Sequence, residues 1–297
     1  VMDGWVMTGY LNLSSELTYS RIPVNIDLAD ADPERVNSNS MSQLYEVPII
    51  PTISDTMVSI FWRGQAFGNH QDVITKVGDS LSASDQYLSL FSAAEYELGP
   101  YDFLEETLLY YRASTAESSI AAQIGLSTYV VFDPVWADAE TCAANETPLA
   151  CEYRTKRPSI AFIMFGPNDV RSMTEVEYNQ QMRLIVEESL LAGVIPVLFT
   201  FSTHEDEEFF WQSINFNLEL VAIAEEYDVP LINLWSAARP LPQFGLDEDM
   251  VHLAHSGFDT LKYDTGHETW YGISLQNLLA LRTLHNIRLT LGLGDYG

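Results

Sequence analysis

Short apolar segments rich in branched residues alternate with segments of helical periodicity from residue 70 onward. The apolar segments span residues 73–77, 159–165, 194–201 and 229–234. Each is short enough for a buried strand and is followed by small or polar residues. The alternation predicts an α/β fold with three layers, α/β/α, around a central, mostly parallel sheet. In such sheets the functional side chains lie at the carboxyl ends of the strands.

Several helices are predicted from capping residues and from the spacing of apolar side chains. Thr174 and Glu177 form a capping-box pattern, and the helix that they begin is expected to end at Gly193. Ser54 is expected to cap a helix that leads to the first strand. Further helices are predicted over 207–227 and 269–289, and shorter ones over 103–111 and 118–124.

The first fifty residues differ from the rest of the chain. Residues 5–13 alternate loosely, as a strand does, whereas residues 27–42 are rich in Asp, Asn and Ser. We therefore predict an N-terminal extension over 1–50 and an α/β domain over 51–297. The extension is expected either to wrap the main domain or to add a strand to a neighbouring subunit, which would make a homo-oligomer.

The charge of the chain excludes some partners. Acidic residues outnumber basic residues by 42 to 14, which gives a formal net charge of -28. This charge opposes binding to nucleic acid and to anionic membrane surfaces. No segment approaches the roughly 18 to 20 apolar residues of a membrane span. No basic segment with an apolar core follows Val1, so we expect that any signal peptide has been removed.

The two cysteines, Cys142 and Cys151, enclose a short polar loop. We predict a disulfide between them, although two unrelated thiols are the alternative. Closing so small a loop contributes about 2.5 to 3 kcal/mol in the chain-entropy model. A disulfide implies an oxidising compartment, and therefore an extracellular or otherwise secreted protein.

Three polar motifs together contain the groups that hydroxyl-based catalysis needs. Ser80 follows the first predicted strand, after the turn-forming Gly78. Asn168 follows the second strand and carries an amide that can donate to an oxyanion. Asp249 precedes His252 by three residues, so that a carboxylate can orient an imidazole base. Taken singly, each motif is also typical of a turn, a helix cap or a surface loop.

A metal site is the rival interpretation of the histidine-rich segment. Histidine and carboxylate groups crowd there at Asp249, His252, His255, Asp264 and His267. The spacing differs from the helical His-Glu-x-x-His arrangement, and glycines divide the segment into loops. We therefore favour an acid–base role, with His255 as the reserve base and Asp247 as the reserve orienting group.

In their order and spacing, the three motifs resemble the GDSL/SGNH hydrolase family over residues 70 to 290. They read Gly78-Asp79-Ser80-Leu81, Gly166-Pro167-Asn168-Asp169 and Asp249-Met250-Val251-His252. The resemblance implies a flavodoxin-like strand order, with Ser80 as nucleophile, His252 as base and Asp249 as its orienting acid. It also implies an oxyanion hole made by the Ser80 amide, the Asn168 side chain and a glycine. We assign that glycine to Gly125, because the usual Asn-x-Gly segment of the family is absent.

The predicted function is hydrolysis of carboxylic esters through an acyl-enzyme, without a metal or organic cofactor. The expected substrate is a small ester or an acylated carbohydrate. The alternative is an extracellular structural protein on a hydrolase fold, in which residues 1–50 join copies into an oligomer or filament.

Overall fold

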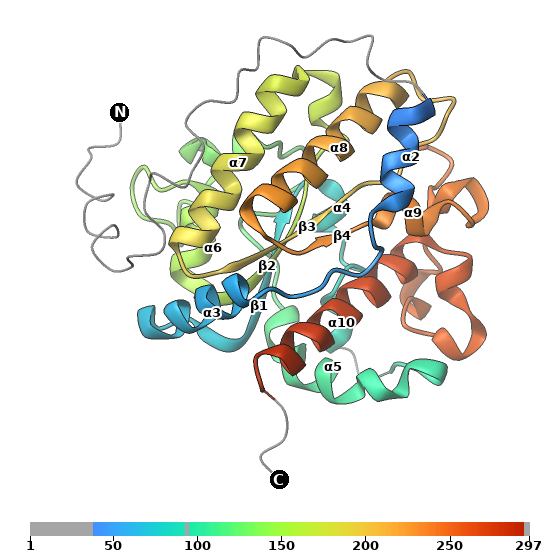
Figure 1. The fold of residues 1–297 in the computed structure, drawn as a ribbon. Coiled ribbons are helices and arrows are strands. Elements are labelled where there is room, and N and C mark those ends of the chain that lie inside the picture. Colours follow the sequence, from blue (N-terminus) through green and yellow to red (C-terminus); the bar gives the residue numbers. More distant parts are fainter. Residues whose placement is uncertain (1–37, 93–94, 294–297) are drawn as a thin grey trace. The chain divides into compact units, whose positions relative to one another are not determined.

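The computed structural model describes residues 38–92 and 95–293, and Figure 1 shows their arrangement. Contacts group these described residues into one compact unit. The strand expected over 5–13 lies outside the described residues, as does most of the polar stretch over 27–42. The proposed joining of subunits by the extension therefore stays a prediction.

A four-stranded parallel sheet forms the centre of the described unit. Its strands are β1 (His70–Gly78), β2 (Pro158–Met164), β3 (Ile195–Phe199) and β4 (Leu231–Ile232). They are paired in the order β1-β2-β3-β4, and all three pairs are parallel. All four strands predicted from the sequence are confirmed.

The edge of β1 that faces away from β2 carries one further pairing. Gly78 forms an isolated parallel bridge with Ala122, in which the Gly78 amide donates to the Ala121 carbonyl at 2.9 Å. If this bridge is counted as the second strand along the chain, the order becomes 2-1-3-4-5. That is the flavodoxin-like order.

Helices cover both faces of this sheet. They are α2 (Ser38–Glu46), α3 (Asp55–Phe67), α4 (Ser80–Ala83), α5 (Glu105–Tyr111), α6 (Pro148–Lys156), α7 (Glu175–Leu191), α8 (Phe210–Tyr227), α9 (Leu234–Ala238) and α10 (Gly272–Thr290). Figure 1 shows α7 and α8 on one side of the sheet and α5 and α10 on the other. Every residue of β2 is buried, as expected for a parallel strand covered on both faces. The predicted three-layer α/β/α architecture is confirmed.

The predicted helix starts agree with the structure where a side-chain cap marks them. The Thr174 side chain accepts from the Glu177 amide, and the Glu177 side chain accepts from the Thr174 amide, so the predicted capping box is present. Ser54 caps α3 as predicted, by accepting from the Met57 amide. By contrast, α8 begins at Phe210 and not at residue 207, because the chain first makes a turn between His204 and Glu207.

The helix predicted over 118–124 is wrong. This segment instead pairs with the end of β1 and then turns. The Ser119 hydroxyl donates to the Lys76 carbonyl at 2.6 Å, and the Gln123 amide donates to the Gly78 carbonyl at 3.2 Å. The Gln123 amide and the Ala121 carbonyl are thus bonded to β1, whereas a helix would satisfy such backbone groups within itself.

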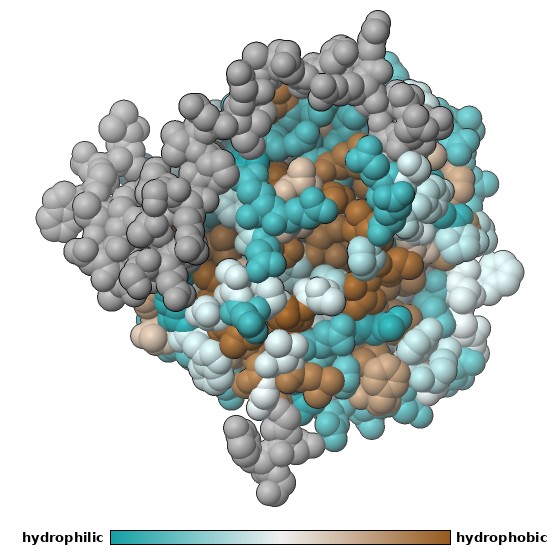
Figure 2. All heavy atoms as spheres, in the orientation of Figure 1, coloured by the Kyte–Doolittle hydropathy of each residue, from teal (hydrophilic) through white to brown (hydrophobic). Residues whose placement is uncertain are grey.

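Residues 38–50 pack against the α/β body. Leu44 of α2 is fully buried in a cluster with Phe210, Ile214 and Trp235. The Asn233 side chain donates to the carbonyl of Leu44 at 2.6 Å. The compact unit therefore begins before the boundary that the sequence suggests at residue 50. Figure 2 shows apolar residues gathered toward the middle of this face, near the stretch that joins α2 to α3.

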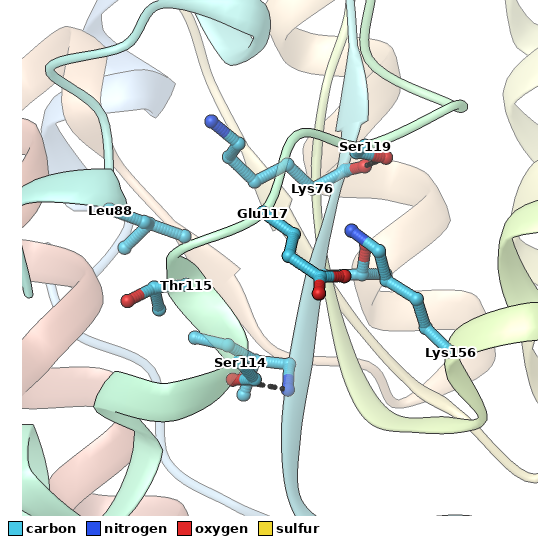
Figure 3. A pocket seen from close by; sticks show the side chains of 9 residues that line it. Lys76, Leu88, Ser114, Thr115, Glu117, Ser119 and Lys156 are labelled. Carbon is cyan, nitrogen blue, oxygen red and sulfur yellow. Dashed lines mark hydrogen bonds between the residues drawn. The ribbon is translucent and has the colours of Figure 1, made fainter. Parts of the chain in front are cut away.

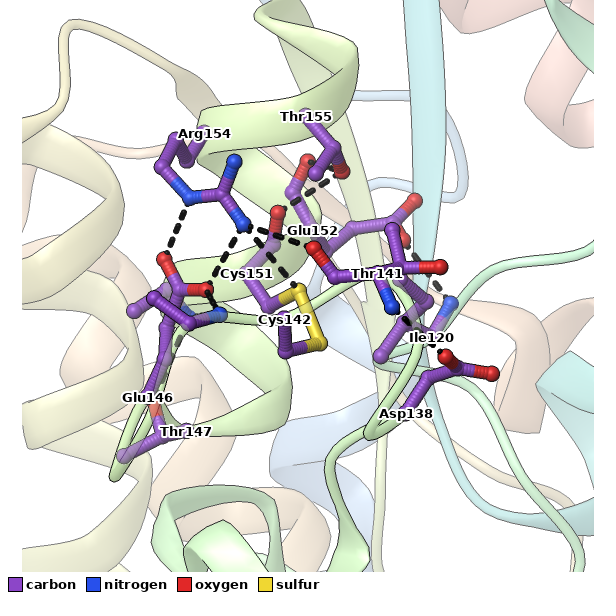
Figure 4. Close-up of a disulfide and its surroundings, with 12 residues drawn as sticks. Ile120, Asp138, Thr141, Cys142, Glu146, Thr147, Cys151, Glu152, Arg154 and Thr155 are labelled. Atoms are coloured by element: carbon purple, nitrogen blue, oxygen red, sulfur yellow. Dashed lines mark hydrogen bonds and ion pairs between the residues drawn. A yellow bond between two sulfur atoms is a disulfide. The ribbon is translucent and has the colours of Figure 1, made fainter.

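The predicted disulfide between Cys142 and Cys151 is confirmed, and it joins a surface loop to α6 (Figure 4). Beside it, Arg154 pairs with Glu146 at 2.7 Å. One residue after Cys151, the buried Glu152 accepts from the Ile120 amide at 2.8 Å. The cross-linked helix thus also holds the segment that pairs with β1. None of the helices within 38–92 and 95–293 is both long and apolar enough to cross a membrane.

Candidate active site

Ser80 lies at the carboxyl end of β1, as the first residue of α4. The preceding turn requires a glycine, because a Cβ at Gly78 would overlap the Met164 carbonyl of β2. Asp79 then caps α4 by accepting from the Leu81 amide at 2.9 Å. The turn therefore brings the Ser80 hydroxyl to the sheet edge where parallel α/β folds place their sites.

Residues 246–253, here called the acid–base loop, carry Asp249 and His252. An antiparallel bridge between Leu246 and Leu253 closes the loop, and the Asp247 amide donates to the His252 carbonyl at 2.8 Å. Within the loop, the Asp249 carboxylate accepts from the Val251 and His252 amides, both at 2.9 Å. These bonds lie within the loop itself, and they fix the orientation of the Asp249 carboxylate.

The side chains of Ser80, His252 and Asp249 form one hydrogen-bonded line. His252 Nε2 lies 2.9 Å from Ser80 Oγ, and His252 Nδ1 lies 2.6 Å from Asp249 Oδ2. Partial burial alone would raise the pKa of Asp249, but hydrogen bonds from the His252 ring and from two backbone amides lower it below its usual value. Asp249 is therefore ionised at neutral pH and can hold a proton on Nδ1. Nε2 is then free to accept the hydroxyl proton.

The reserve groups lie elsewhere. His255 Nδ1 accepts from the Gly257 amide at 3.1 Å, and the Asp247 carboxylate accepts from the Glu248 amide at 2.8 Å. The five candidate metal ligands of the histidine-rich segment do not form a cluster among the described residues, and His267 Nδ1 lies 2.8 Å from the Asp259 carbonyl. In the described part of the chain, the cluster that resembles a metal site is Cys142, Glu146 and Cys151, and its two sulfurs are joined in the disulfide.

Asn168 follows β2 and lies beside the segment that bridges to β1. Its side-chain amide donates to the Leu126 carbonyl at 2.9 Å. An amide nitrogen carries two N–H groups, so the second remains for an oxyanion. Gly125 occupies the third position of a turn from Gln123 to Leu126 and has φ +85°, which a type II turn requires. Among the hydrogen bonds within the described ranges, none is donated by the Gly125 amide.

Two buried carboxylates, Asp79 and Asp169, adjoin Ser80 and Asn168 in the chain. Burial raises the pKa of Asp79 to about 7, and the Asp169 carboxylate adds to the rise. The Leu81 amide, which donates to Asp79 at 2.9 Å, and the charge of His252 oppose it. Burial likewise raises the pKa of Asp169 to about 6, against hydrogen bonds from the Thr128 amide and hydroxyl at 2.9 and 2.7 Å. We call these two residues the buried acid pair.

No sequence pattern predicts a role for the buried acid pair. Both residues stand inside quoted motifs, directly before Ser80 and directly after Asn168. Their burial depends on residues from three separate segments, which no local pattern reveals. Through the amides of Leu81 and Thr128, the pair fixes the backbone after Ser80 and in the segment that follows Gly125.

A small polar pocket on the opposite side of β1 does not take part in the site (Figure 3). Lys76 lines it, but its ammonium group is engaged, since it donates to the carbonyls of Ser84 and Tyr87 at 3.2 and 3.1 Å. Lys156 also lines it and donates to the Ser118 carbonyl at 2.6 Å. These two lysines therefore anchor loops next to β1.

Comparisons with known proteins give structural likeness only. The chain matches no family model and no curated protein. Its fold is similar to that of solved lipases and esterases, one of which is described as a GDSL-like lipase. A lipase/acylhydrolase from Enterococcus faecalis is 18% identical with a TM-score of 0.47, and the match covers 72% of this chain and 95% of that one.

Two other solved structures are similar to a comparable degree. An acetylxylan esterase from Geobacillus stearothermophilus is 15% identical with a TM-score of 0.47, over 73% of this chain and 95% of that one. A GDSL-like lipase from Bacteroides thetaiotaomicron is 11% identical with a TM-score of 0.45, over 77% and 98%. At these identities the chemistry has to be inferred from the side chains of this chain.

Proposed function

We propose that the protein is an ester hydrolase that works through a serine acyl-enzyme. The observation that carries the proposal is the hydrogen-bonded line from Ser80 Oγ through the His252 ring to Asp249. A serine hydroxyl is a weak nucleophile by itself, and a neutral imidazole in hydrogen-bond contact is the group that activates it. Asp249 keeps the imidazole in the required tautomer.

In the acylation step, Ser80 Oγ attacks the ester carbonyl carbon while His252 Nε2 takes the hydroxyl proton. The carbonyl oxygen becomes an oxyanion, which accepts from the Asn168 side chain and from the Ser80 and Gly125 amides. The intermediate then collapses, and the leaving alcohol receives the proton from His252. In deacylation, water attacks the acyl carbon while His252 takes its proton; the bond to Ser80 Oγ then breaks, Oγ receives that proton from His252, and the carboxylic acid leaves.

We also propose an extracellular or otherwise oxidising location. The disulfide between Cys142 and Cys151 supports it, because such bonds persist mainly outside the reducing cytosol. The net charge of -28 supports a substrate that is not nucleic acid.

Hydrolysis of p-nitrophenyl acetate by the whole chain tests the proposal. We expect Ser80→Ala to lower kcat by about 10⁴-fold or more, because it removes the nucleophile. Asn168→Ala should lower kcat by about 10²- to 10³-fold through the loss of one oxyanion donor. Ser59→Ala, an exposed serine of α3, is the matched control and should keep the wild-type rate. Equal rates for the wild type and Ser80→Ala would contradict the proposal.

A further inference from the structure

A pocket adjoins the proposed catalytic groups, between the segments that follow β2 and β3. Pro167 and Val251 line it, and they directly precede Asn168 and His252 in the chain. The space in it that a water-sized sphere can enter is about 20 Å³. Whole small-molecule sites are typically about 300 to 1,000 Å³, so the pocket suits a small group and not a whole substrate.

The inner wall of this pocket is apolar. Val170 and Phe201 line it and are almost completely buried. Ser202 lines it as well, but its hydroxyl donates to the Phe244 carbonyl at 2.7 Å and accepts from Arg239 at 3.1 Å. The hydroxyl is thus engaged away from the pocket. A ligand group that reaches this wall would meet hydrocarbon, and the polar side chains of the lining, such as Thr203 and Ser213, lie elsewhere around the pocket.

An ion pair forms the charged part of the pocket lining. Arg171 and Glu207 both line the pocket, and their side chains meet at 3.0 Å. Arg171 is half exposed and its guanidinium also lies over the Phe209 ring, 5.8 Å from the centroid. Because the pair is neutral as a unit, it does not favour an anionic ligand. It does favour a short ligand, since a longer chain would have to displace the pair.

The other flank of the site is open. Ile124 and Tyr129, on the segment that carries Gly125, are 81% and 61% exposed, and Val135 is 85% exposed. Trp136 packs against this segment, because its ring lies 3.6 Å from where a Gly125 Cβ would be and its carbonyl accepts from Gln123. An unbounded apolar surface can take a large group that the pocket cannot.

We infer that the pocket between Pro167, Phe201 and Val251 binds the acyl group of the substrate, and that the Arg171–Glu207 pair limits it to short, uncharged acyl chains. The larger alcohol part then lies over the exposed segment around Ile124 and Tyr129. The inference rests on the proposed function, since it assigns the two parts of an ester to two sides of Ser80. It makes Arg171 and Glu207 specificity-determining residues.

A series of p-nitrophenyl esters with acyl chains of increasing length tests this assignment, because the leaving group stays constant. In the wild type, kcat/KM should be highest for the shortest chains and fall steeply as methylenes are added. Arg171→Ala should raise the ratio of kcat/KM for hexanoate to that for acetate by about 10-fold or more, because one methylene in an apolar pocket changes rates by roughly 10- to 200-fold. Glu207→Gln should shift the ratio in the same direction and by less, because it breaks the pair but keeps the volume.

A variant that fills the pocket gives the opposite change. Ser213, which lines the pocket from α8, can be replaced in Ser213→Val. This variant should lower kcat/KM for butyrate relative to acetate. Arg154→Ala is the control for removing an arginine, because Arg154 also pairs with a glutamate at the surface and has a similar exposure of 50%. It should leave the chain-length profile unchanged.

The outcomes separate the two proposals. Ser80-dependent hydrolysis with the same chain-length profile in Arg171→Ala, Ser213→Val and the wild type would overturn the acyl-pocket assignment alone. So would variants that alter selectivity among acetate esters of different alcohols and leave the acyl profile unchanged. Absence of any Ser80-dependent hydrolysis would overturn the proposed function and this inference together.

Discussion

The acid–base loop and the buried acid pair place the same kind of side chain in opposite surroundings. In the loop, the side chains of Asp249 and His252 are 51% and 50% exposed. In the pair, Asp79 and Asp169 are fully buried. The pKa of Asp249 is lowered by hydrogen bonds from its own loop, whereas burial raises the pKa of Asp79 to about 7.

The exposed and the buried carboxylates have two different roles. Asp249 has to stay ionised in order to hold the His252 ring, and donors from the adjacent backbone keep it ionised without burial. The buried acid pair instead accepts from the Leu81 and Thr128 amides, and so positions the chain next to Ser80 and Asn168. The first role affects turnover directly, and the second affects stability and its dependence on pH.

The largest expected effect is on turnover, in Asp249→Asn. An amide in place of the carboxylate favours the wrong imidazole tautomer, and the corresponding change in serine proteases lowers kcat by about 10⁴-fold. We expect a loss of similar size in kcat for p-nitrophenyl acetate. Asp247→Asn, in the same loop, is the matched control and should stay within a few-fold of the wild type. Similar rates in both variants would show that Asp249 does not orient the base.

The second expected effect concerns stability and pH, in Asp79→Asn. Between the unfolded-state pKa of about 4 and the folded-state pKa of about 7, Asp79 is protonated in the folded chain and ionised in the unfolded chain. The folded state then binds more protons, so the free energy of unfolding falls as pH rises through this window and levels off above it. Asp79→Asn removes this contribution, because its amide does not titrate.

Urea unfolding at a series of pH values checks the second prediction. From pH 4 to pH 8 the wild type should lose stability more steeply than Asp79→Asn, and the variant should gain relative to the wild type as pH rises. Asp247→Asn again serves as the control and should follow the wild-type slope. Parallel curves for wild type and Asp79→Asn would mean that the buried carboxyl is already ionised at low pH.

The smallest expected effect concerns the backbone of the acid–base loop. Met250 has φ +58°, a left-handed conformation that costs a residue with a Cβ roughly 1 to 2 kcal/mol. Met250→Gly and Met250→Ala remove the same contacts, but only glycine relieves this cost, against a loss of about 0.5 to 1 kcal/mol in backbone entropy. The free energy of unfolding of Met250→Gly should therefore be up to about 1 kcal/mol higher than that of Met250→Ala. The reverse order would show that the loop does not hold Met250 in this conformation.

The contrast between contacts within a loop and contacts across the fold also explains which features the sequence predicts. The four strands, the capping box at Thr174 and the pairing of Cys142 with Cys151 follow from short patterns, because neighbouring residues determine them. The contact between Asp249 and His252 is likewise predictable, since the two residues are three positions apart in the chain. The prediction of a helix over 118–124 is wrong because backbone groups of this segment pair with β1.

The buried acid pair and the acyl pocket depend on contacts across the sheet edge. Asp169 lies close enough to Asp79 to raise its pKa, and Val251 and Phe201 line the same pocket although they come from different segments. No periodicity or cap records such a contact. The sequence therefore gives no role to residues that lie next to the reactive residues of a motif.

Covalent labelling with a fluorophosphonate tests most directly that Ser80 is a nucleophile activated by His252. Mass spectrometry of the labelled and digested chain should find one adduct per molecule, on the peptide that contains Ser80. His252→Ala should label far more slowly at the same probe concentration, and Ser59→Ala should label like the wild type. An adduct at another residue, no adduct, or an equal labelling rate in His252→Ala would contradict the account.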